Sequence, residues 1–119
     1  MRRLLCISLF LASLAACVGQ VPEPSTQHVA LAQSRWPGTT QAELSEGRTL
    51  FVERCSGCHS LPVPAEHKAA EWPDVMERMT PFVRMTPHQL EAVERYLIVA
   101  SEAAGGGAQQ ANNTGARSN

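Results

Sequence analysis

The stretch that decides the fold covers residues 40–59 and reads TQAELSEGRTLFVERCSGCH. Thr40 and Glu43 have the spacing of a capping box, in which each side chain binds the backbone amide of the other residue. Apolar residues then recur every three or four positions, which predicts a helix over residues 41–54. The predicted helix therefore ends where a pair of cysteines and a histidine follow in the chain.

Cys55, Cys58 and His59 form the Cys-Xaa-Xaa-Cys-His pattern of covalent haem attachment. Two thiols at this spacing can reach the two vinyl groups of one porphyrin, and the adjacent histidine then lies under the iron as an axial ligand. A thioredoxin-like thiol pair would need a βαβ setting, and a structural zinc site would need four ligands. We therefore expect one covalent haem c, bound by Cys55, Cys58 and His59.

The chain resembles the class I c-type cytochromes over about residues 41–100. That family has a helix with a glycine and an aromatic residue before the haem motif and a C-terminal helix with Tyr-Leu, which here correspond to Gly47, Phe51, Tyr96 and Leu97. The resemblance implies that the two helices cross where Gly47 contacts the region of Tyr96. The stretch from His59 to Met79 is shorter than is usual in the family, which leaves little room for a middle helix.

Three methionines follow the haem motif and are candidates for the sixth ligand of the iron: Met76, Met79 and Met85. The resemblance favours Met79, because the family's ligand lies on a loop six or seven residues before the C-terminal helix and is often followed closely by proline, here Pro81. Met85 is the alternative, ahead of Met76. Trp72 is a candidate to donate its indole N–H to a haem propionate, with simple packing as the competing interpretation.

The two ring nitrogens of His59 would need two different partners, the iron and a hydrogen-bond acceptor. A ligand histidine normally donates its second ring N–H to an acceptor, and the carbonyl oxygen of Pro62 or Pro64 is a candidate acceptor for His59. Both prolines are also explained as ordinary loop residues. If no methionine binds the iron, His67 and His88 are the next candidates, and such a site would suit a sensor or an enzyme.

Two further helices are expected after the motif. A short helix begins near Pro73, since proline suits a first turn. The last helix has Thr86 as its N-cap and Pro87 at its first position, followed by an apolar stripe made of Leu90, Val93, Leu97 and Ala100. No window alternates with the period of a strand, so the sequence predicts an all-α domain over residues 40–102.

The N-terminal residues 1–16 have a positive start and a short apolar run, which is typical of an export signal peptide rather than a membrane span. The run closes on Leu14-Ala15-Ala16-Cys17, which resembles the lipobox of bacterial lipoproteins. We expect lipidation of Cys17 and attachment to a membrane on the periplasmic side. Val18 favours the outer membrane, because it is not the aspartate that retains some lipoproteins at the inner membrane.

The two flanking segments lack the pattern of a packed core. Residues 17–39 contain several prolines and no periodicity, which predicts a lipidated N-terminus followed by a flexible spacer. Residues 103–119 are mostly small and polar, which predicts a disordered tail. The domain between them is small enough that a bound cofactor would contribute much of its buried surface.

A His/Met-ligated haem has no open coordination position, so its expected function is electron transfer. We therefore expect redox proteins and a membrane as partners, no small-molecule substrate and no enzymatic activity. The formal net charge of −1 becomes more negative once Arg2 and Arg3 leave with the signal, which argues against nucleic acid as a partner. The alternatives are a haem-based sensor, a small haem enzyme, or a haem subunit of a larger oxidoreductase.

Overall fold

The computed structural model describes residues 21–115, with side chains described as far as Gly105. Every regular element in this range is helical, which confirms the predicted all-α fold class. The elements in chain order are α2 (Thr26–Arg35), α3 (Gln41–Cys55), η2 (Pro64–Glu66), η3 (Ala69–Glu71), α4 (Trp72–Met79), η4 (Thr80–Phe82) and α5 (Pro87–Gly115). None of these helices is long and apolar enough to cross a bilayer.

Helices α3 and α5 begin at their predicted capping residues. Thr40 Oγ1 accepts the backbone N–H of Glu43 at 3.2 Å, and Glu43 Oε2 accepts the N–H of Thr40 at 2.7 Å. Thr86 and Gln89 make the same reciprocal pair at the start of α5. Because each box pairs two amide groups that would otherwise have no partner, both helix starts could be read from the sequence.

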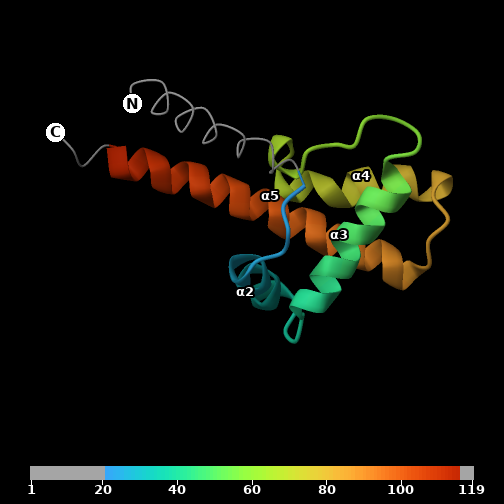
Figure 1. Cartoon of the computed structure of the whole chain (residues 1–119), viewed down its shortest axis with the longest axis horizontal. Coiled ribbons are helices and arrows are strands. Elements are labelled where there is room, and N and C mark those ends of the chain that lie inside the picture. The colour runs from blue at the N-terminus through green and yellow to red at the C-terminus, as the bar shows by residue number, and fades with distance from the viewer. Residues whose placement is uncertain (1–20, 116–119) are drawn as a thin grey trace, which may run out of the picture.

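The crossing of α3 and α5 forms the centre of the fold (Figure 1). A Cβ atom added to Gly47 would lie 3.0 Å from Tyr96 Cβ and closer still to the backbone carbonyl of Ala92. Only glycine allows the two helices to approach this closely. The contact between Gly47 and the region of Tyr96 that the family resemblance implied is therefore confirmed.

Helix α5 is the common partner of the other elements. Helices α2 and α4 lie on opposite sides of it in Figure 1, and α2, α3, η2, η3 and α4 all contact it. The main core contains Phe51, Trp72, Val93, Tyr96 and Leu97, all at most 2% exposed. This core forms the floor beneath the end of α3, where the cysteines lie.

Residues 21–39 are not the flexible spacer that the sequence predicted. Helix α2 buries Ala32 in a second core cluster with Leu44 and Val99. Ahead of α2, the carbonyl oxygens of three residues accept hydrogen bonds from α3 and α5, in the pairs Val21 with Arg48, Pro22 with Tyr96, and Pro24 with Gln41. These bonds are made by the backbone of the segment, so residue periodicity does not reveal them.

The C-terminal boundary also differs from the prediction. Helical backbone continues past residue 102 to Gly115, in the segment expected to be disordered. Extending an existing helix needs no new nucleation, and the alanines and glutamines of this segment favour a helix, whereas its glycines and asparagines do not. Residues 1–20 and 116–119 lie outside the described part of the chain, and with them the predicted signal peptide, the lipidation site at Cys17 and the end of the predicted tail.

Candidate functional site

A groove lies between the C-terminal end of α3, the loop that follows it, α4 and η4. It encloses a cavity of about 310 Å³, at the lower end of the range of about 300 to 1,000 Å³ that is common for cofactor and small-molecule sites. The lining includes all five predicted cofactor-binding residues, namely Cys55, Cys58, His59, Trp72 and Met79. Residues separated by up to two dozen positions in the sequence therefore meet at one apolar cavity.

The two cysteines lie where α3 ends and its last turn opens into the loop. Both are free thiols, Cys55 half-buried and Cys58 exposed. Burial raises the pKa of the Cys55 thiol, and the neighbouring Cys58 raises it further. A thioredoxin-like nucleophile needs a thiol pKa below the usual range, and no βαβ unit occurs within residues 21–115. The structure thus gives no support to the thioredoxin-like alternative.

His59 is held by its own neighbour. Its Nδ1 lies 2.8 Å from the carbonyl oxygen of Ser60, and since a carbonyl can only accept, Nδ1 donates and Nε2 is left with its lone pair for a metal. The predicted acceptors Pro62 and Pro64 are wrong. The carbonyl of Pro64 instead accepts the hydroxyl of Ser101 at 2.7 Å.

The three methionines separate into two groups. Met76 and Met79 line the groove, at 8% and 37% exposure, while Met85 packs against the outside of the main core and is not part of the groove lining. The alternative sixth ligand Met85 is therefore not supported by the structure. Met79 is the last residue of α4 rather than a loop residue, because α4 continues to the residue before Thr80.

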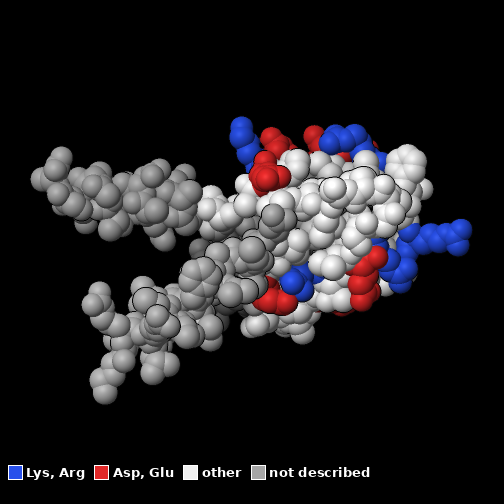
Figure 2. Space-filling view, turned by 45° about the horizontal axis from the view of Figure 1, so that its top comes forward, with Lys and Arg blue, Asp and Glu red and all other residues white. Residues whose placement is uncertain are grey.

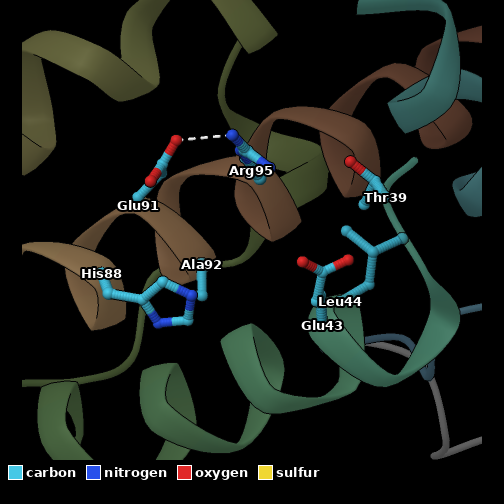
Figure 3. Close-up of a pocket in the computed structure, with 7 residues that line it drawn as sticks. All are labelled: Thr39, Glu43, Leu44, His88, Glu91, Ala92 and Arg95. Atoms are coloured by element: carbon cyan, nitrogen blue, oxygen red, sulfur yellow. Dashed lines mark hydrogen bonds and ion pairs between the residues drawn. The ribbon is translucent and has the colours of Figure 1, made fainter. Parts of the chain in front are cut away.

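Neither His67 nor His88 contributes to the groove lining. His67 packs its ring against the edge of Trp72, with 4.9 Å between ring centroids. His88 lines a separate small pocket at the crossing of α3 and α5, beside Glu43 and Arg95, as Figure 3 shows. Among the described residues, His, Cys, Asp and Glu side chains form no group of three able to hold a metal ion, which also leaves the zinc alternative without its ligands.

Trp72 lines the groove with its ring, but its polar atom is already bound. The side chain is 1% exposed, and the indole N–H donates to the hydroxyl oxygen of Ser101 at 2.5 Å. Phe51 meets the same ring edge-on, with 6.4 Å between centroids. The predicted hydrogen bond from Trp72 to a propionate is therefore wrong for this arrangement, and the packing interpretation holds.

Sequence reasoning missed several residues of the groove, among them Arg54 and Phe82. Arg54 is the arginine in the lining, and it stands directly before Cys55 in the last turn of α3. Phe82, in the single turn of η4, is 76% exposed. Within the part of the chain that the structure describes, Phe82 and Met79 are the exposed large apolar side chains, and both line this groove. The sequence signal for Phe82 was an aromatic residue in a single helical turn, because the other residues of such a turn cannot cover its ring.

Charged side chains of both signs are mixed on one face of the domain. On the face shown in Figure 2, acidic and basic side chains are interspersed around a broad area of uncharged residues. Where acidic and basic side chains alternate in this way, their electric fields largely cancel beyond the screening length, which is about 8 Å at physiological ionic strength. The groove itself has a mainly apolar lining, to which Arg54 adds one positive charge.

Comparison with known proteins adds no relative. No family model, no curated protein and no solved structure matches this chain.

Proposed function

We propose that this chain is a monohaem c-type cytochrome that carries single electrons. The observation that supports this most directly is the position of the Cys-Xaa-Xaa-Cys-His motif on a groove that also contains the exposed apolar residues Met79 and Phe82. Exposed apolar surface that is concentrated at one concave site is typical of a surface that a ligand covers. A flat, largely apolar cofactor beside Cys55 and Cys58 fits that surface.

The residues of the groove have distinct proposed roles. Cys55 and Cys58 would form the two thioether bonds, each thiol adding across one vinyl group. His59 would supply Nε2 as a ligand of the iron, in an orientation maintained by the bond from Nδ1 to the carbonyl oxygen of Ser60. Met79 would supply the sulfur ligand from α4. When bound, haem supplies an iron that alternates between the ferric and ferrous states by one electron.

The surroundings of the ligands favour electron transfer over catalysis. Buried Phe51, Trp72 and Met76 make an apolar wall on one side of the groove, and apolar surroundings would raise the cost of the extra positive charge on ferric iron. A peroxidase would need an open coordination position with an acid–base group beside it. His67 and His88 lie outside the groove lining, so neither supplies that group from its described position.

The proposal also covers the location of the protein in the cell. An export signal over residues 1–16 and lipid on Cys17 would hold the domain on the periplasmic side of a bacterial membrane, with redox proteins as partners. A Cys17→Ser variant is expected to lose incorporation of labelled fatty acid and to leave the membrane fraction. Unchanged labelling would contradict lipidation at Cys17 without affecting the haem proposal.

The haem proposal is tested by expressing the protein in a host with a haem-attachment system and measuring its mass. One haem should remain bound after extraction with acidified acetone. Cys55→Ser and Cys58→Ser should each lower the yield of this product, while Ser56→Ala, which leaves all three motif residues in place, should not. Haem that extracts freely, or a mass without haem, would contradict the proposed function.

A further inference from the structure

Ser101 lies on α5, one turn after Leu97, and its side chain connects three separate parts of the domain. Its hydroxyl oxygen accepts the indole N–H of Trp72 at 2.5 Å, and it lies 2.7 Å from the carbonyl oxygen of Pro64 and 2.9 Å from that of Leu97. The residue is buried. Because a serine hydroxyl carries one hydrogen, it donates to one of these two carbonyls at a time.

The bonds made by Ser101 reach both sides of the proposed haem site. Trp72 is part of the groove lining, whereas Ser101 itself is not. Pro64 is the one buried residue between His59 and Trp72, and together with the half-buried Leu61 and Ala69 it attaches the loop after the haem motif to the core. That loop begins with Ser60, whose carbonyl oxygen orients His59.

We propose that Ser101 is a positioning residue for the haem groove. Its single hydroxyl keeps the indole N–H of Trp72 turned into the core and anchors, at Pro64, the loop that starts at His59. This inference rests on the proposed haem site. In this inference Ser101, which is not part of the groove lining, limits the access of water to the groove and maintains the orientation of His59.

Removing the Ser101 hydroxyl is expected to destabilise the described arrangement of Trp72. In a Ser101→Ala variant the buried N–H of Trp72 has no partner, and a buried unpaired donor is costly. The indole would therefore turn toward water, and the loop at Pro64 would open more often. Water nearer the iron stabilises the ferric state, so the reduction potential should fall.

The experiment compares haem-loaded wild type with haem-loaded Ser101→Ala. Amide hydrogen exchange over residues 60–71 should accelerate by about tenfold, the factor that corresponds to the net contribution of one buried hydrogen bond, and the reduction potential should fall. Tyr96→Phe is the matched control, since it also removes a hydroxyl that binds a proline carbonyl, that of Pro22. It should leave exchange over residues 60–71 and the potential unchanged.

A second variant keeps the proposal testable if Ser101→Ala does not accumulate. Trp72→Phe removes the N–H without leaving a buried donor unpaired, so in that background Ser101→Ala removes only the bond to the Pro64 carbonyl. Exchange over residues 60–71 should then be faster in the double variant than in Trp72→Phe, while the reduction potentials of the two should be similar. Additive effects, or a Ser101→Ala protein with the exchange and potential of wild type, would overturn the role of Ser101. A wild type without covalent haem would instead contradict the proposed function, and exchange over residues 60–71 would still report on Ser101.

Discussion

The hydroxyl of Tyr96 donates to the carbonyl oxygen of Pro22 at 2.7 Å, although the two residues are 74 positions apart in the chain. Tyr96 is fully buried where α5 meets α3, and Pro22 lies just ahead of α2. One hydrogen bond therefore connects the first described residues to the helix that organises the core. Arg48 adds a second connection, since it binds the carbonyl of Val21 and pairs with Glu23 at 2.9 Å.

The first prediction concerns alkaline stability. Burial, and to a lesser degree Glu23, raises the pKa of Tyr96 to about 12, against an opposing effect of Arg48. The unfolded chain loses this proton near its ordinary pKa of about 10, so the folded state is favoured below that pH and progressively less so up to about pH 12. Denaturant midpoints measured from pH 9 to pH 12 should fall, and Tyr96→Phe should remove that part of the decrease.

The second prediction concerns acid stability and His28. Burial lowers the pKa of His28, whose Nδ1 accepts the N–H and the hydroxyl of Ser25. The folded state therefore favours the neutral ring, and its stability is full above the unfolded pKa of about 6.5 and is lost as the pH falls through the lowered value. His28→Gln, whose amide oxygen can still accept from Ser25, should flatten this loss in acid denaturation curves. A His28→Gln protein whose acid denaturation curve keeps the wild-type slope would contradict the assignment to His28.

The third prediction concerns the helix crossing. Gly47→Ala places a methyl group against the backbone carbonyl of Ala92, and backbone cannot move aside as a flexible side chain can. We expect a loss of about 1 to 3 kcal/mol in the free energy of unfolding, the usual cost of overpacking. Gly105→Ala is the control, because nothing lies within 4 Å of its added Cβ. That change should be neutral or stabilise α5 by about 1 kcal/mol or less.

The fourth prediction concerns the sixth ligand. In oxidised protein with bound haem, a weak charge-transfer band near the red edge of the visible spectrum should report the iron–sulfur bond. Met79→Ala should abolish this band, lower the reduction potential and open a site for carbon monoxide, because a thioether ligand favours ferrous iron. Met85→Ala should keep the band. Loss of the band in Met76→Ala alone would assign the ligand to the other methionine of the groove, and a wild type without the band would reopen the sensor or enzyme alternative.

The parts of the fold that were predictable depend on local rules. Thr40 with Glu43, and Thr86 with Pro87, mark helix starts because capping involves residues only three or four positions apart. The meeting of the cysteine motif with Met79 was predictable only through a family resemblance, since no local pattern places α4 beside the end of α3.

The parts that were not predictable depend on bonds between distant backbone and side-chain groups. Helix α2 was missed because its position is set by small Ala32 and by the carbonyls that precede it, neither of which produces an amphipathic stripe. The assignment of Trp72 to a propionate failed for a similar reason. Ser101, its actual acceptor, is 29 residues away, and a serine in an apolar helix gives no indication of its partner.

The position of α5 at the end of the chain has a consequence for the order of assembly. Helices α2, α3 and α4 and the turns η2 and η3 all pack on α5, so neither core cluster is complete until the last helix is present. In a chain threaded through an export channel from its N-terminus, Cys55 and Cys58 would reach the far side before Val93 and Leu97 do. An attachment enzyme would then meet both thiols on an open segment, and the arrival of α5 would close the apolar wall over the product.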